Sequence, residues 1–170
     1  MATFPSRWAV SQRAVVSECR VTVPVMPIRP VVSLITLGVH DVAASTRFYE
    51  LLGFERSSSS VAGEVSFFRT PGSILALWGA AELAADADVA PRSGDAFRGA
   101  ALAINLASPA DVDAALAGAQ AAGAVITRPA RAVEWGGYSG YFADPDGHVW
   151  EVAHNPFWPL DDRGLPQLPD

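Results

Sequence analysis

The segment GHVWEVAH (147–154) places one carboxylate, Glu151, among apolar and β-branched neighbours. A carboxylate in such surroundings must be hydrogen-bonded, solvated or protonated, because desolvation disfavours its charge and raises its pKa. It can act as a general base, or it can anchor a cationic or amide group of a ligand. The alternative is a structural carboxylate that tyrosine and water hold in place. We take Glu151 as the candidate catalytic residue.

The element that positions Glu151 is the second arm of a predicted β-hairpin. The turn sequence DPDG (144–147) combines a proline, which fixes φ, with aspartates that hydrogen-bond locally and a glycine that can adopt a positive φ. Aromatic and β-branched residues on both sides of the turn predict two strands, over 137–144 and 147–154. Side chains alternate along a strand, so Glu151 is expected to point away from the face of Trp150.

This hairpin closes the second of two similar units, each with a strand and a helix followed by three more strands. In the first unit, Asp41 is placed to cap a helix that Gly53 ends. In the second unit, Ser108 and Asp111 have the spacing of a capping box. The predicted elements are the strands 31–39, 54–59, 64–70 and 72–79 with the helix 41–53, then the strands 99–107, 124–130, 137–144 and 147–154 with the helix 108–123. We therefore predict an α+β fold of two tandem β-α-β-β-β modules that form a cup-shaped mixed sheet with the helices on its outer face.

The expected organisation is a single domain with a tail at each end. The first 29 residues are rich in arginine and show no clear period, so they are left out of the fold prediction. The predicted parts are a loose N-terminal extension (1–29), the domain (30–157) with module one (30–80), a linker (81–97) and module two (98–157), and a C-terminal tail (158–170).

One face of the predicted strands is bulky and apolar, and the other is smaller and more mixed. The apolar face suits contact with the helices, so the mixed face is expected to line the cavity of the cup. On the mixed face, Thr36 and Asn105 can donate hydrogen bonds beside Glu151, and Trp78 suits stacking on a ring or a cation, although an indole equally fills a core. Tyr141 adds an aromatic wall with a polar tip. The ligand-binding candidates are therefore Thr36, Trp78, Asn105 and Tyr141.

Composition narrows the functional classes. The formal net charge is −6 and no basic stripe is present, so we expect no nucleic-acid partner. No apolar run approaches the roughly 18 residues of a membrane-spanning helix, so we expect no membrane partner. Every cationic side chain is arginine, which excludes a Schiff-base lysine. The single cysteine, Cys19, cannot form an internal disulfide, and a reducing cytoplasm is the expected location.

The module order and two motifs, LGVHDVAASTRFYELLGFE (37–55) and YFADPDGHVWEV (141–152), resemble the vicinal oxygen chelate superfamily. This superfamily includes glyoxalase I, extradiol dioxygenases, fosfomycin-resistance enzymes and bleomycin-resistance proteins. The resemblance covers about residues 31–155. It implies a cup that receives a small organic ligand and, because members commonly dimerise, a homodimer.

Metal-dependent members of the superfamily hold a divalent cation in the cup. Their usual ligands are a histidine on the first strand of each module and a glutamate on the last strand, sometimes with a fourth group. Glu151 matches the glutamate, but the other positions fall on Leu34, Ala101 and Ala76, whose side chains cannot bind a metal. The resemblance therefore implies neither the usual metal site nor another cofactor.

Two main functions stay open at this point. The first is a small-molecule-binding protein of the glyoxalase or bleomycin-resistance type, without the usual divalent metal. The alternative is a superfamily enzyme, lyase or dioxygenase-like, that uses Glu151 as a base or as one ligand of a non-standard metal site. Such a site would need His40, His148 or His154. A third hypothesis, an interaction module, rests only on the aromatic pair at 157–158.

Overall fold

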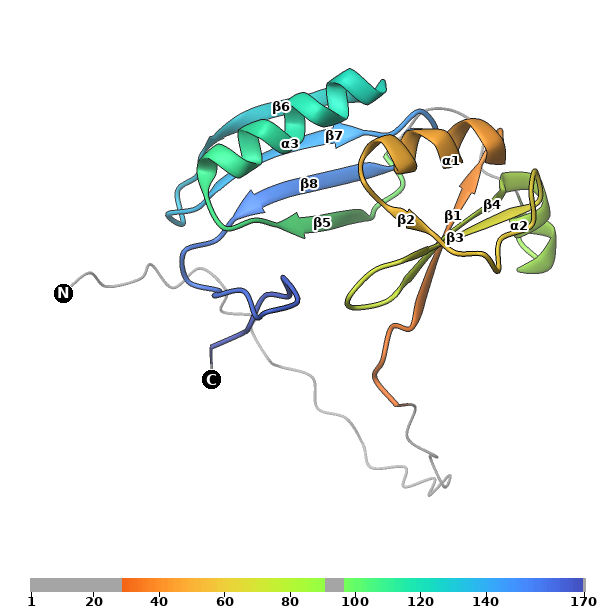
Figure 1. Ribbon diagram of the computed structural model, residues 1–170, viewed down its shortest axis with the longest axis horizontal. Helices are drawn as coiled ribbons and strands as arrows, with labels where there is room; N and C mark the ends of the chain where they lie inside the picture. The colour runs from red at the N-terminus through yellow and green to blue at the C-terminus, as the bar shows by residue number, and fades with distance from the viewer. Residues whose placement is uncertain (1–28, 91–96, 170) are drawn as a thin grey trace, which may run out of the picture. The chain divides into compact units, whose positions relative to one another are not determined.

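Each module folds into a four-stranded mixed sheet with a helix against one of its faces. The computed structural model describes residues 29–90 and 97–169 (Figure 1). The predicted N-terminal extension, Cys19 included, lies outside the described residues except for Arg29. All helices and strands of the described residues belong to the unit Val31–Asp170.

The observed elements follow the predicted order. Module one holds β1 (Leu34–Val39), α1 (Val42–Leu51), β2 (Glu55–Arg56), β3 (Val65–Arg69) and β4 (Ile74–Gly79), and module two holds β5 (Ala101–Asn105), α3 (Pro109–Ala122), β6 (Val125–Ala132), β7 (Tyr138–Ala143) and β8 (Val149–His154). The sheet orders are β1-β4-β3-β2 and β5-β8-β7-β6, and in each sheet the first and last strands of the module are parallel. The predicted α+β fold with two tandem modules is confirmed, and the strands form one separate sheet per module.

One element was not predicted. The expected linker begins with a third helix, α2 (Ala80–Asp86), which packs near β1 and β4. Its sequence, AAELAAD, contains mostly strong helix formers, so local propensity explains the helix.

Local signals at the helix ends account for where α1 and α3 begin and stop. The Asp41 carboxylate accepts a hydrogen bond from the Ala44 amide at 2.9 Å, and the Ser108 hydroxyl accepts one from the Asp111 amide at 3.2 Å. At the other end of α3, Gly123 adopts a φ of 107°, which favours glycine. The predicted caps are therefore confirmed.

The two modules share one hydrophobic core. Tyr49 on α1 is 0% exposed and Trp150 on β8 is 4% exposed, and their ring centroids lie 5.9 Å apart. Phe54 of module one packs edge-on against Trp150, and Phe142 of module two stacks flat on it. The core side chains of both sheets thus lie on the faces predicted to be apolar.

The C-terminal tail folds back onto module one. The Asp161 carboxylate accepts hydrogen bonds from the amides of Arg163 and Leu165, which closes a turn between Leu160 and Pro166. From this turn, the Arg163 guanidinium donates to the Pro71 carbonyl in the β3–β4 hairpin. Among the residues that the structure describes, no helix is both long and apolar enough to span a bilayer.

Candidate functional site

Glu151 lies on the face of the second sheet that α3 does not cover. Its neighbours along β8, Trp150 and Val152, are buried in the core, so the alternation of the strand directs Glu151 to the opposite face. The side chain is half-buried there. The prediction that Glu151 points away from the helix-covered face is confirmed.

A row of polar side chains crosses this face of the second sheet. Arg128 on β6 pairs with Tyr141 on β7, and Tyr141 pairs with Glu151 on β8. The Arg128 guanidinium carbon lies 4.7 Å from the centre of the Tyr141 ring. Burial and the neighbouring Glu151 carboxylate raise the pKa of the Tyr141 phenol above its ordinary value, against the charge of Arg128. The row therefore places a guanidinium, a phenol that stays neutral at neutral pH and the Glu151 side chain next to one another.

The sequence did not predict Arg128 as a site residue because β6 is irregular. Strict alternation would place Arg128 on the same face as Ile126, which packs against the core. However, Ile126 pairs with Phe142 and Arg128 pairs with the next residue, Tyr141, so β6 carries one extra residue between them. Such a β-bulge turns the following side chains to the other face. The signal in the sequence was Pro129, since proline inside a strand is typical of edges and bulges.

The other predicted ligand-binding residues lie on both sheets. Asn105 on β5 shares the Glu151 face, because β5 pairs Ala103 with Glu151. Thr36 on β1 and Trp78 on β4 lie on the corresponding face of the first sheet. The structure thus brings Tyr141 and Glu151 together and leaves Thr36 and Trp78 on the other sheet. A common cavity for all five residues stays a prediction.

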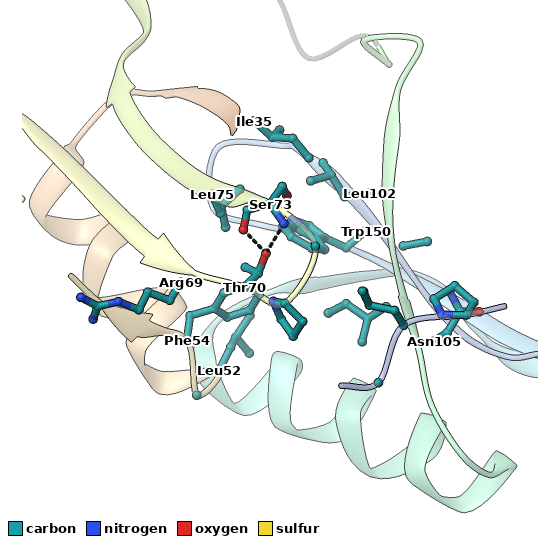
Figure 2. Close-up of a pocket in the computed structure, with 18 of the residues that line it drawn as sticks. Ile35, Leu52, Phe54, Arg69, Thr70, Ser73, Leu75, Leu102, Asn105 and Trp150 are labelled. Atoms are coloured by element: carbon teal, nitrogen blue, oxygen red, sulfur yellow. Dashed lines mark hydrogen bonds between the residues drawn. The ribbon is translucent and has the colours of Figure 1, made fainter. Parts of the chain in front are cut away.

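A cavity of about 920 Å³ lies between the modules, on the side of the core (Figure 2). Its walls are mainly apolar, with Ile35 and Leu75 from module one and Leu102 and Trp150 from module two. Asn105 lies at its edge, and the turn of the C-terminal tail contributes residues 164–166. Glu151 is not among the lining residues, so this cavity is distinct from the polar row.

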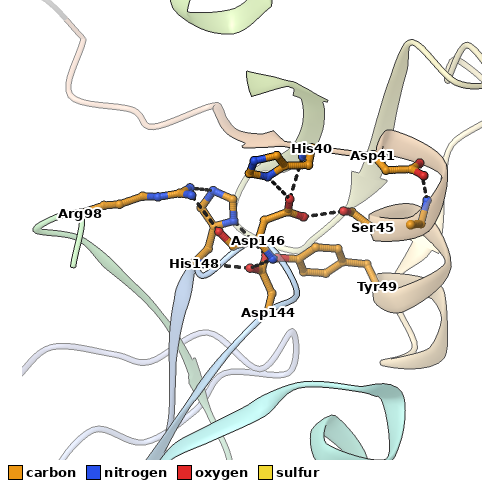
Figure 3. A network of polar contacts seen from close by, with 9 residues as sticks. His40, Asp41, Ser45, Tyr49, Arg98, Asp144, Asp146 and His148 are labelled. Atoms are coloured by element: carbon orange, nitrogen blue, oxygen red, sulfur yellow. Dashed lines mark hydrogen bonds and ion pairs between the residues drawn. The ribbon is translucent and has the colours of Figure 1, made fainter. Parts of the chain in front are cut away.

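A polar network joins α1 to the DPDG turn (Figure 3). The Tyr49 hydroxyl donates to the Asp144 carboxylate at 2.6 Å and accepts from the Trp150 indole N–H at 3.1 Å. The His148 ring contacts the same carboxylate at 2.9 Å, and the Arg98 guanidinium contacts the other ring nitrogen. The network therefore ties the turn of module two to the helix of module one.

Buried charge in this network is stabilised by its hydrogen bonds. Burial disfavours the Asp144 carboxylate, but hydrogen bonds from His148 and Tyr49 outweigh it and lower the pKa of Asp144 below its ordinary value. Burial and the Asp144 charge raise the pKa of the Tyr49 phenol far above its ordinary value.

Asp146, two residues further along the turn, makes two more contacts with module one. Its carboxylate accepts hydrogen bonds from the Ser45 hydroxyl at 2.6 Å and from the His40 amide at 2.7 Å.

The described residues do not fit the metal site of the metal-dependent members. The register pairs Thr36 with Ala76 and Ala103 with Glu151, which confirms Ala76 as the position equivalent to Glu151. Within residues 29–90 and 97–169, no three His, Cys, Asp or Glu side chains lie close enough to hold a metal ion.

The histidines that were considered as substitute ligands have other contacts. His40 and His148 contact the turn carboxylates, and a His154 ring nitrogen lies 3.1 Å from the Leu106 carbonyl.

Comparison with known proteins identifies the family. Residues 31–152 match the family described as the Glyoxalase/Bleomycin resistance protein/Dioxygenase superfamily. The chain belongs to this superfamily. The resemblance to the vicinal oxygen chelate proteins is thereby confirmed. No curated protein matches the sequence significantly.

Solved structures of the superfamily share the fold. A glyoxalase-related enzyme from Fulvimarina pelagi is 38% identical, with a TM-score of 0.74 over 82% of this chain and 99% of that one. A glyoxalase/bleomycin resistance protein/dioxygenase from Nocardioides is 31% identical, with a TM-score of 0.64 over 76% and 86% of the two chains. Lactoylglutathione lyase from Agrobacterium tumefaciens is 25% identical, with a TM-score of 0.59 over 79% and 100%.

Proposed function

We propose that this superfamily member binds a small organic molecule on the Glu151 face of the second sheet, without the usual divalent metal. The main support is the pairing of Tyr141 with Glu151 on a half-buried face that also carries Asn105. A phenol and a carboxylate held side by side provide a donor and an acceptor whose positions are fixed by the sheet. The metal-free form is supported by the aliphatic residues Leu34, Ala76 and Ala101 at the expected ligand positions.

The alternative is an enzyme in which Glu151 acts as the base. It is favoured by the pairing of Tyr141 with Glu151, because a phenol next to the carboxylate supplies a hydrogen-bond donor beside the group that accepts the proton. Under this hypothesis, Glu151→Gln abolishes turnover of the ligand but retains part of the binding. If the protein is only a binder, Glu151→Gln weakens ligand binding and the wild type shows no turnover of the ligand.

We also propose a homodimer in the cytoplasm. The paired residues Leu34 and Ile74, at the start of β1 and β4, are 43% and 44% exposed, and β1 is an unpaired edge within the described residues. A second copy packed on this edge would cover both exposed side chains. One cysteine in the whole sequence agrees with a reducing compartment.

The experiment combines metal content with ligand screening. The untagged protein is incubated with Ni²⁺, Zn²⁺, Mn²⁺ or Fe²⁺, dialysed and analysed for bound metal, and it is then screened against small organic molecules by thermal shift and calorimetry. We expect far less than one metal per chain, and at least a tenfold loss of affinity for a screened ligand in Glu151→Gln. Glu50→Gln on the exposed surface of α1 is the matched control and should bind normally.

Two results contradict the proposal. Near-stoichiometric metal that disappears in Glu151→Gln would mean that Glu151 is a metal ligand. Ligands that bind equally well to the wild type and to Glu151→Gln would place the binding site elsewhere, with the cavity between the modules as the next region to test.

A further inference from the structure

We infer that Arg128 binds an oxyanion group, a carboxylate or a phosphoryl group, of the ligand, a step that rests on the proposed function. Arg128 lies in the same cross-strand row as Tyr141 and Glu151, on the uncovered face of the second sheet. The ligand would therefore be an organic acid rather than a neutral or purely cationic molecule.

Among the described residues, the Arg128 guanidinium has no acidic partner. One of its terminal nitrogens donates to the Ser139 hydroxyl at 2.6 Å, and its Nε is buried without a hydrogen-bond partner. A buried donor left unpaired is costly, and a half-buried guanidinium is stabilised by an anion. Because the Nε itself is buried, the terminal nitrogens of the half-buried guanidinium are the atoms that a ligand oxygen would contact.

The fold holds the guanidinium in a fixed orientation. The β-bulge turns Arg128 out of the core, and the Tyr141 ring supports the guanidinium plane at 4.7 Å. The Ser139 hydroxyl, on a residue that is 2% exposed, fixes one edge of the group. A guanidinium that is ordered before binding loses little entropy on binding and can receive an oxyanion through two parallel N–H groups.

The spacing of the row adds a second requirement. Tyr141 separates Arg128 from Glu151, and neighbouring strands lie roughly 4.8 Å apart, so their backbones are on the order of 10 Å apart. A ligand that spans both would place its oxyanion at Arg128 and a hydrogen-bond donor or cationic group towards Glu151. This pattern describes an acid that also carries an amine, amide or hydroxyl group.

The negative net charge of the protein means that an anionic ligand needs a local cationic side chain in order to bind. With a formal net charge of −6, the protein as a whole repels anions. An anionic ligand therefore needs a specific cationic contact, and Arg128 provides it beside the carboxylate of Glu151.

The test uses simple anions on the intact protein. Nitrogen-15 NMR of the arginine Nε–H groups is recorded while inorganic phosphate, or separately acetate, is added at constant ionic strength, with sodium chloride as the reference. The Arg128 signal, assigned by its loss in Arg128→Lys, should shift and saturate with phosphate or acetate, and the two arms show which oxyanion is preferred. Arg131→Gln, which changes an exposed arginine on the same strand, is the matched control and should leave this shift unchanged.

The inference is wrong if the chemical shift of the Arg128 signal does not change, or changes equally with chloride. This outcome is measured on the wild-type protein, so it does not depend on the stability of a variant. Glu151→Gln separates the two proposals, since it should weaken the organic ligand, whereas the phosphate or acetate shift should persist and saturate at an equal or lower anion concentration because a nearby negative charge is removed. If screened ligands prove to bind Glu151 but lack an oxyanion and bind Arg128→Gln normally, the inference fails and the proposed function stands. If the anion shift is present but no organic ligand binds, the proposed function fails and the anion site stands.

Discussion

Tyr49 carries a hydroxyl group in the middle of the hydrophobic core. Burying a hydroxyl group lowers stability unless the group forms hydrogen bonds inside the protein. The hydroxyl donates to Asp144 and accepts from the Trp150 indole. Both partners are themselves buried. Removing the hydroxyl would leave a carboxylate oxygen and an indole N–H without this partner, in a region that water does not reach.

We predict that Tyr49→Phe lowers the free energy of unfolding by about 1–3 kcal/mol, the usual cost of leaving buried polar groups unpaired. Urea denaturation followed by circular dichroism measures the change. Tyr138→Phe is the matched control, because the Tyr138 hydroxyl bonds to Asp113 at an exposed position and should matter little. Equal stabilities of Tyr49→Phe and the wild type would show that the network contributes nothing.

Asp144 makes the free energy of unfolding depend on pH in the acidic range. Its pKa is lowered in the folded protein relative to the unfolded chain, so its charged form stabilises the fold above the ordinary pKa of an aspartate, and this contribution is lost as the pH falls through the lowered value. We expect Asp144→Asn to be less stable than the wild type at neutral pH and to lose less stability between about pH 5 and about pH 2. Urea midpoints at several pH values provide the measurement. Parallel pH profiles for the two proteins would contradict this role.

At the level of elements, α3 approaches β7 closely because Gly140 has no side chain. A Cβ atom at this position would lie 2.5 Å from the Leu116 side chain on α3 and 2.9 Å from the Ala130 amide on β6. The Ala130 contact is with the backbone, which cannot move aside as a side chain can. The glycine therefore sets the distance between the helix and the sheet that carries Glu151.

Gly140→Ala is expected to destabilise the protein by about 1–3 kcal/mol through overpacking. Gly118→Ala on α3 is the control, and it should stabilise the protein. Nothing lies within 4 Å of its added Cβ, and alanine is more favourable than glycine in a helix by roughly 0.5–1 kcal/mol. Thermal or urea unfolding of both variants tests the pair. The packing argument fails if Gly140→Ala is as stable as Gly118→Ala.

The order of the elements could be predicted from the sequence because it depends on local signals. Asp41, Ser108 and Gly123 define helix ends within a few residues of themselves, and the alternation along β8 is enough to orient Glu151. Arg128 could not be oriented in the same way, because a single extra residue in β6 reverses the alternation. The hydrogen bond from Tyr49 to Asp144 also escaped prediction, since it joins residues 95 positions apart in the sequence.

At the scale of the whole molecule, the proposed dimer accounts for apolar residues that the single chain leaves uncovered. We expect light scattering after gel filtration to give twice the chain mass of 17.9 kDa. Leu34→Glu should shift the mass towards that of one chain, because it places a charge on the exposed apolar edge. Val89→Glu changes an exposed valine outside the sheets and is the control. A wild-type mass of one chain at micromolar concentration would refute the dimer.

The shared core has a consequence for the continuity of the chain. Tyr49 and Phe54 belong to one module and Trp150 to the other, so neither half can bury its aromatic residues alone. The described residues of the link between α2 and β5 (87–90 and 97–100) are not part of that core. Two separately expressed halves, cut in this link, would therefore complement each other. If each half were fused to one of two other proteins, refolding of the two halves into one domain would indicate that those two proteins bind each other.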